Sequence, residues 1–254
     1  MFVAYVGAFA AIIAFSLLAA GIVHGLNPDL PEDAVFDGLP GLLAGAGASS
    51  AALLLTTLAV NRGAPLVALR LIPGRETGRA LVVMVVGMLA LGQALDSLTM
   101  LTGLGERGNM VAIRKALAQA VGPDLFLAVI VIGVLAGTAQ EIFFRAYMQT
   151  RLGERFRPRL AVLIASACFG ILHIEWLHAI LAFLLGLYLG WITELAGSAL
   201  PAVACHVINN AVFTLLTALW GAIEGAPVNA GLGVACAVAF AGCVVWLHRT
   251  RTAL

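Results

Sequence analysis

Chemically capable side chains occur in three short stretches of an otherwise apolar chain, "QEIFFR", "FGILH" and "HVINN". The candidate site residues in them are Gln140, Glu141, Arg145, Phe169, His173, His206 and Asn210. A carboxylate and imidazoles around one cavity suit water activation, and an imidazole with an amide can hold a developing oxyanion. The set therefore predicts amide hydrolysis without a covalent intermediate.

The spacing within each stretch predicts which side chains share a helix face. Two polar or aromatic residues stand four positions apart in each one, so they lie on the same face of a helix. We expect an ion pair between Glu141 and Arg145, and a hydrogen bond between His206 and Asn210. At 1.5 Å per residue the three stretches reach similar depth, so their side chains can meet if the three helices pack together.

Composition identifies the setting of these residues as a membrane. Of 254 residues, 62% are hydrophobic and only 11% are charged, which is typical of an integral membrane protein. A charged side chain in hydrocarbon is costly and is retained mainly where it faces a bundle interior or a wet cavity. The net charge of +1 offers no general attraction for nucleic acid.

Hydropathy predicts an all-α polytopic membrane protein with about eight transmembrane helices in one domain, residues 1–254. The first apolar stretch is interpreted as a span and not as a cleaved signal peptide. The fifth is short and ends at the polar "HIEWLH", which indicates an incomplete crossing. The expected helices are about 2–23, 39–60, 80–101, 124–148, 160–174, 177–195, 199–219 and 230–247.

The distribution of arginine predicts the orientation. Ten arginines fall on the side of the termini and three basic residues on the other, where the first loop is acidic, so both termini are expected in the cytoplasm. The residues counted are Arg62, Arg70, Arg75, Arg79, Arg151, Arg155, Arg157, Arg159, Arg249 and Arg251 against Arg107, Arg114 and Lys115, with Asp29, Glu32, Asp33 and Asp37 in the acidic loop. The preference for arginine over lysine and the Ala/Gly/Leu richness favour a bacterial inner membrane.

The three stretches together resemble the CPBP family, which comprises CAAX-processing endopeptidases of the prenyl-protein type and bacteriocin-immunity-type intramembrane proteases. The family signature is EExxxR, then FxxxH, then HxxxN, on successive helices. Here the order is "QEIFFR", "FGILH" and "HVINN", and the resemblance covers about residues 124–215. It implies a catalytic core of the fourth to seventh helices.

The resemblance also implies a role for each site residue. Gln140 occupies the place of the water-activating glutamate, and Glu141 is the second acid, which shapes the site together with Arg145. His173 would assist water activation, and Phe169 would pack beside it. His206 and Asn210 would form the oxyanion-stabilising pair. The implied reaction is cleavage of an internal peptide bond in a membrane-anchored protein or peptide within the lipid bilayer.

Gln140 departs from the family pattern in a way that matters for activity. Glutamine has nearly the shape of glutamate but cannot lose a proton near neutral pH, so it cannot be a general base. Glu141 is no easy substitute, because adjacent helix positions point about 100° apart. Either an engineered exchange, which the conserved shape favours, or a natural variant would account for Gln140, and both leave an inactive or weakened protease.

Three alternatives remain open. Glu141, His173 and His206 could bind zinc with an open coordination position, but the chain has no HExxH motif, so we favour catalysis without a cofactor. A non-catalytic membrane immunity or scaffold protein of the same fold is the main functional alternative, because of Gln140. A small carrier is a third, although the two halves show no repeat.

Other polar residues are assigned structural roles. We expect Asp96 to pair with polar groups across the bundle or at the external interface, and Glu175, His178 and Glu194 to lie at the membrane interfaces. Segment 104–120 has helical periodicity and is expected to lie flat on the outer surface. The four cysteines are interpreted as buried apolar side chains rather than disulfide partners or nucleophiles.

Overall fold

The computed structural model describes residues 1–29, 31–32 and 36–250, and these residues contain no β-strand. Within them, seven helices are long and apolar enough to cross a membrane, which confirms an all-α polytopic membrane protein. Asp33 and Arg251, which count in the predicted orientation, lie outside the described residues. The seven helices are α1 (Phe2–Leu26), α3 (Leu39–Val60), α4 (Gly78–Leu101), the continuous helix Pro123–Gly153, α10 (Trp176–Ala196), α11 (Leu200–Trp220) and α12 (Ala226–Thr250).

The long helix Pro123–Gly153 is not a uniform α-helix. It consists in order of α6 (Pro123–Ala128), the π-helical segment η3 (Val129–Ala136), α7 (Gly137–Glu141), the π-helical segment η4 (Ile142–Gln149) and α8 (Thr150–Gly153). π-Helical turns are rare and occur frequently at functional sites. Here they flank the five residues of α7, which carry Gln140 and Glu141. The wider turns rotate the neighbouring side chains away from the positions of an unbroken α-helix.

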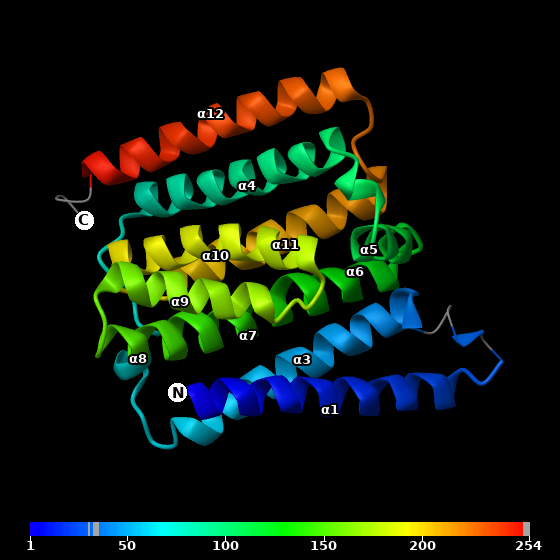
Figure 1. Ribbon diagram of the computed structural model, residues 1–254, viewed down its shortest axis with the longest axis horizontal. Helices are drawn as coiled ribbons and strands as arrows, with labels where there is room; N and C mark the ends of the chain where they lie inside the picture. The colour runs from blue at the N-terminus through cyan, green and yellow to red at the C-terminus, as the bar shows by residue number, and fades with distance from the viewer. Residues whose placement is uncertain (30, 33–35, 251–254) are drawn as a thin grey trace.

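The helices stack in layers (Figure 1). α12 packs against α4 at one side of the bundle and α1 against α3 at the other. Between these outer pairs lie α10, α11, the long helix and α9 (Pro158–Ile171). α1 begins and α12 ends at the same end of the bundle, as two termini on one side of a membrane require. Which side that is stays a prediction.

Small residues let α11 approach the long helix closely. A Cβ atom added to Gly133 would lie 3.1 Å from the Cβ atom of Ala211, and one added to Gly137 would lie 3.2 Å from the backbone nitrogen of Val207. Glycine at such points permits close backbone contact between membrane helices. This contact places His206, next to Val207, beside the acidic residue of α7.

α9 is the short fifth helix that the sequence indicated. Its 14 residues span only about 20 Å, less than the roughly 30 Å of a bilayer core. It ends at Ile171 and not at 174 as expected, so His173 lies in the turn that follows. Ile174 adopts a positive φ of 61°, an outlier conformation for a β-branched residue. The chain therefore reverses within the depth of the bundle, next to the candidate site.

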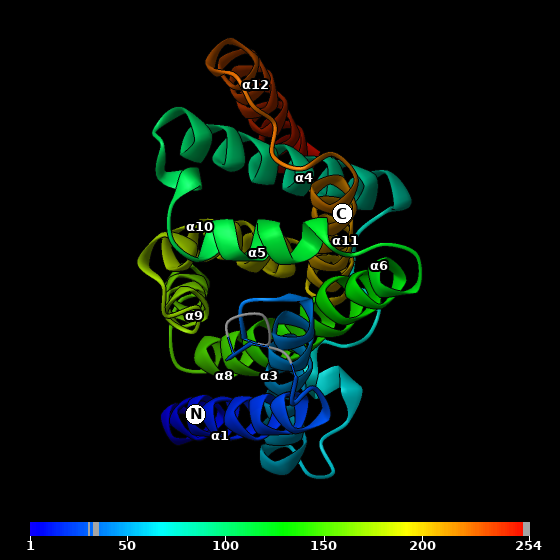
Figure 2. The same ribbon diagram turned by 90° about the vertical axis from the view of Figure 1, so that its right-hand side faces the viewer.

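Two shorter helical elements join α4 to the long helix, η2 (Leu104–Glu106) and α5 (Asn109–Ala118). Viewed end-on, α5 lies across the end of the bundle, near α10 and α11 (Figure 2). Its residues Ala116 and Leu117 are buried. The amphipathic segment is thus helical as expected, but it packs onto the bundle and does not merely lie on a membrane surface.

A polar network ties the opposite end of the core together, near η1 (Leu66–Leu69). The Glu194 carboxylate accepts hydrogen bonds from Arg70 at 2.7 Å and from the Gln149 amide at 2.8 Å. Gln149, which is fully buried, also donates to the carbonyl of Gly190. Glu194 lies near the end of α10 and joins this helix to the long helix and to the loop after α3. The sequence predicted its position near a helix end but not these two contacts.

Candidate active site

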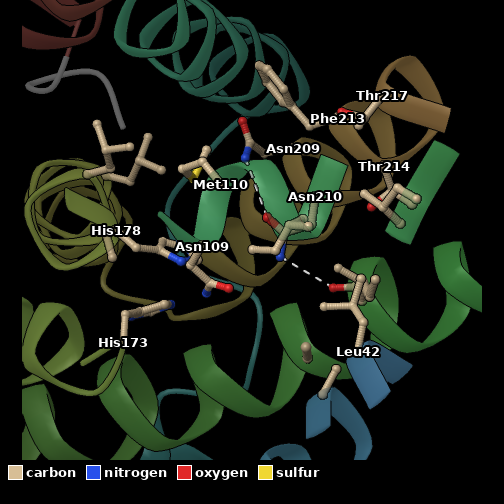
Figure 3. A pocket seen from close by; sticks show the side chains of 18 of the residues that line it. Leu42, Asn109, Met110, His173, His178, Asn209, Asn210, Phe213, Thr214 and Thr217 are labelled. Carbon is tan, nitrogen blue, oxygen red and sulfur yellow. Dashed lines mark hydrogen bonds between the residues drawn. The ribbon is translucent and has the colours of Figure 1, made fainter. Parts of the chain in front are cut away.

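A cavity of about 660 Å³ opens between α3, α4, α5, the long helix, α11 and the first half of α10 (Figure 3). We call it the site cavity. Its lining includes most of the residues singled out in the sequence, from three separate elements. The polar and aromatic residues that line it include Gln140, Phe169, His173, His178, His206, Asn209 and Asn210. The expected convergence of the three stretches therefore occurs.

Glu141 lies behind the cavity wall and does not line the cavity. Its carboxylate is fully buried between Arg145 and His206. The Oε2 atom lies 3.2 Å from Arg145 Nε, which confirms the predicted ion pair. The Oε1 atom lies 2.7 Å from His206 Nδ1, a contact that the sequence did not reveal. The carboxylate thus points away from Gln140's side of the helix, as the 100° rotation predicts.

The Arg145 side chain is fully buried, and besides Glu141 it contacts one carbonyl group and one aromatic ring. Its Nη2 donates to the carbonyl of Gly186 on α10 at 3.2 Å, and its guanidinium carbon lies 5.2 Å from the centroid of the Phe169 ring. Stacking of a guanidinium over an aromatic face is a favourable cation–π arrangement. Arg145 therefore connects α10 and α9 to Glu141 and supports the wall from behind.

The tautomer of His173 follows from its hydrogen bond. Its Nδ1 lies 3.0 Å from the backbone carbonyl of Phe169. Because a carbonyl only accepts, Nδ1 carries the hydrogen and Nε2 of the neutral ring carries the lone pair. The Phe169 ring packs edge-on against both imidazoles, with centroid distances of 5.0 Å to His173 and 5.8 Å to His206. The lone pair of His173 is thus available for a proton from water.

His206 and Asn210 do not form the hydrogen bond that their spacing suggested. His206 turns to the Glu141 carboxylate, while Asn210 Nδ2 donates to the carbonyl of Ile132 on η3 at 3.3 Å. Asn210 Oδ1 accepts from the Asn209 amide at 3.5 Å. Competition from partners on the long helix explains the difference. Both side chains still line the same cavity, and the second Nδ2 hydrogen of Asn210 is uncommitted to Ile132.

Gln140 faces the cavity beside these groups. Among the hydrogen bonds of residues 1–29, 31–32 and 36–250, none involves its side chain amide. An unused amide oxygen and amino group on a cavity wall can orient a water molecule. Neither can accept its proton.

Three lining residues were not recognised in the sequence. His178, expected at an interface, lines the cavity with its ring centroid 4.5 Å from that of His173. Asn109 on α5 lies beside these imidazoles in Figure 3. Asn209, the first asparagine of "HVINN", lies on α11 and also lines the cavity. Of the three, only His178 could have been suspected from the sequence, because it follows "FGILH" by five residues. The turn at 173–175 brings its ring back beside His173.

An ion pair between α4 and α5 forms part of the lining of the site cavity. Asp96 on α4 accepts from Arg114 on α5 at 2.7 Å, and Arg114 also donates to the Gly105 carbonyl at 2.9 Å. The expected pairing of Asp96 with a polar group is therefore confirmed. This pair fastens α5 to α4 and holds Asn109 over the site. Glu175 caps α10, accepting from the backbone nitrogens of Leu177 and His178.

The geometry bears on the zinc alternative. Within the described part of the chain, no three His, Cys, Asp or Glu side chains gather closely enough to hold a metal ion. The Phe169 ring packs against both His173 and His206, and the two carboxylate oxygens of Glu141 already contact Arg145 and His206. This arrangement suits a hydrogen-bonding site better than a ligand set.

Comparison with known proteins places the same segment in a family. Residues 122–212 match the family model described as type II CAAX prenyl endopeptidase, Rce1-like. No curated protein and no solved structure matches the chain. The matched segment contains all three motif stretches, together with the long helix, α9, α10 and part of α11, which line the site cavity. Segment 122–212 is therefore similar to the type II CAAX prenyl endopeptidases, and this similarity supports membership of the CPBP family.

Proposed function

We propose that the protein is an intramembrane endopeptidase that hydrolyses an internal peptide bond of a membrane-anchored protein or peptide. The observation that carries this proposal is the site cavity. Gln140, His173, His206 and Asn210 line one space, with the Glu141–Arg145 ion pair directly behind its wall. The similarity of residues 122–212 to the type II CAAX prenyl endopeptidases supports peptidase activity in general.

The reaction begins with water in the cavity. The side chain of Gln140 orients the water, and one proton passes to Nε2 of His173 while the water oxygen bonds to the scissile carbonyl carbon. The carbonyl π electrons move onto the oxygen and form an oxyanion. When the C–N bond breaks, the proton on His173 moves to the departing amine. Water and amide are thereby converted into a carboxylic acid and an amine, without a cofactor.

The oxyanion is held by donors on α11. The Glu141 carboxylate beside Nδ1 orients the His206 ring so that its Nε2 side can donate to the oxyanion. Asn210 adds the hydrogen of Nδ2 that Ile132 does not use. Such preorganised donors contribute about 10²–10³-fold each to the rate. Glu141 acts through His206, and Arg145 balances its charge.

Because Gln140 cannot accept the proton of the water, we expect the native chain to be a weak enzyme. A carboxylate at this position would take the proton of the water directly, and its loss removes a term worth about 10²–10⁴-fold. The same residue favours the second candidate, a non-catalytic membrane immunity or scaffold protein of this fold. The two candidates differ in one outcome, which is whether position 140 controls cleavage.

The experiment uses proteoliposomes that contain the native chain or the Gln140→Glu variant and a membrane-anchored peptide substrate. Hydrolysis is carried out in ¹⁸O-labelled water, and the products are identified by mass spectrometry. The proposal predicts cleavage at one internal bond, slow for the native chain and fast for the variant, with one ¹⁸O atom in the new carboxyl terminus. Cleavage by neither protein, with both folded, would favour the scaffold.

A further inference from the structure

His178 carries a half-buried imidazole that the proposed reaction leaves without a role. It lies in the first turn of α10 and lines the site cavity. Its backbone nitrogen donates to Glu175, but among the described residues no hydrogen bond to its ring nitrogens is formed. A neutral imidazole facing a cavity with no partner is an unused base.

The ring of His178 lies next to the proton acceptor of the proposed reaction. Its centroid is 4.5 Å from that of His173, with the two planes tilted by 46°. At this separation the ring nitrogens are within reach of a direct or single-water proton step. Figure 3 shows both imidazoles side by side at the cavity, with the Asn109 amide of α5 beside them.

The hydrogen bond of His173 gives the pair a direction. Nδ1–H of His173 is committed to the Phe169 carbonyl, so a proton received from water sits on Nε2, at the cavity. The other groups that face His178 are Glu175, which caps the same helix turn, and His173 itself. Two imidazoles this close share one proton more readily than they carry two. A proton on His173 can therefore pass to His178, where the Glu175 carboxylate is near.

We propose that His178 is a proton-relay residue that, paired with His173, supplies in this chain the base that Gln140 cannot be. The inference rests on the proposed endopeptidase function. In the relay, the water proton moves to Nε2 of His173 and then to a ring nitrogen of His178, and it returns by the same route to the departing amine. No other reactant is needed, and each proton taken up is given back within one turnover.

The inference predicts that dependence on His178 is conditional on residue 140. When Gln140→Glu restores a carboxylate beside the water, the proton has a nearer acceptor and the relay is no longer required. A structural role for His178 would instead cost the same in both backgrounds. The two backgrounds therefore separate a relay from a packing contribution.

The test measures kcat and KM for peptide cleavage in proteoliposomes by four proteins. These are the native chain, His178→Ala, Gln140→Glu, and the double variant. We expect His178→Ala to lower kcat about 30-fold in the native background with KM within about twofold, and to lower it less than about threefold in the Gln140→Glu background. Free imidazole in the buffer should restore part of the lost rate of His178→Ala, because the cavity can admit it. The control is His24→Ala, an exposed histidine of α1.

Each other outcome overturns the relay. Equal losses in both backgrounds, or no loss and no rescue, would assign His178 to packing or to no role. An inert native chain beside an active Gln140→Glu variant would also refute the relay, while the endopeptidase function would stand. If both the native chain and Gln140→Glu were inert and folded, the proposed function would fail, and the relay with it.

Discussion

Replacing Glu141 by glutamine removes the negative charge on which two buried groups depend. The Arg145 guanidinium has no exposed surface, and in the described structure its one hydrogen bond runs from Nη2 to the Gly186 carbonyl. The Glu141 carboxylate, 3.2 Å from Arg145 Nε, is the charge that compensates it. The neutral amide keeps the shape of the side chain and leaves a buried, uncompensated cation.

The expected loss of stability is large. Removing one partner of a buried ion pair costs about 3–5 kcal/mol, whereas replacing both partners by neutral groups can be nearly neutral. A loss of this size is a substantial share of the roughly 5–15 kcal/mol that stabilises a folded protein. The double variant Glu141→Gln/Arg145→Met should therefore recover at least about half of the loss.

The free energy of unfolding is measured in detergent micelles by tryptophan fluorescence. Glu154→Gln serves as the control, because it breaks the exposed pair with Arg151 and should cost less than about 1 kcal/mol. If Glu141→Gln destabilised the protein no more than Glu154→Gln, the buried ion pair would not be a main support of the site. If the double variant were as unstable as Glu141→Gln, packing would be the cause, and charge would not.

Two further predictions concern packing and chemistry. Gly190→Ala should destabilise the protein by about 1–3 kcal/mol in the same unfolding assay, because its Cβ atom would lie 2.8 Å from the buried amide oxygen of Gln149; a stability equal to the native value would show that the close contact is absent. In the Gln140→Glu background, Asn210→Ala should lower kcat about 10²–10³-fold through loss of an oxyanion donor. Thr217→Ala, at another residue of the cavity lining, should leave kcat within about threefold, and equal losses in the two variants would contradict the role of Asn210.

Much of the fold was predictable because hydropathy alone determines where membrane helices lie. The span 39–60 coincides with α3, and the short fifth helix was recognised from its length. Lipid forces the backbone to satisfy its own hydrogen bonds, so an apolar run of this length has few alternatives to a helix. The π-helical segments were not predicted, since Val129–Ala136 has the composition of an ordinary apolar helix.

The site was predictable in its members and less so in its contacts. The pair Glu141–Arg145 follows from a four-residue spacing within one helix. The hydrogen-bond partner of Asn210 does not follow from spacing. The choice between His206 and the Ile132 carbonyl depends on how α11 packs against η3. His178 was missed for a similar reason. Its place in the cavity depends on the reversal of the chain after α9, where Ile174 takes a positive φ.

Peptide hydrolysis in the site cavity, with residue 140 facing the water, is tested by the ratio of cleavage rates between Gln140→Glu and the native chain. The matched control is Gln119→Glu, the same exchange at an exposed position. We expect Gln140→Glu to raise kcat/KM at least about 100-fold and Gln119→Glu to leave it unchanged. A Gln140→Glu protein that is folded yet cleaves within threefold of the native rate would contradict this role of the site cavity.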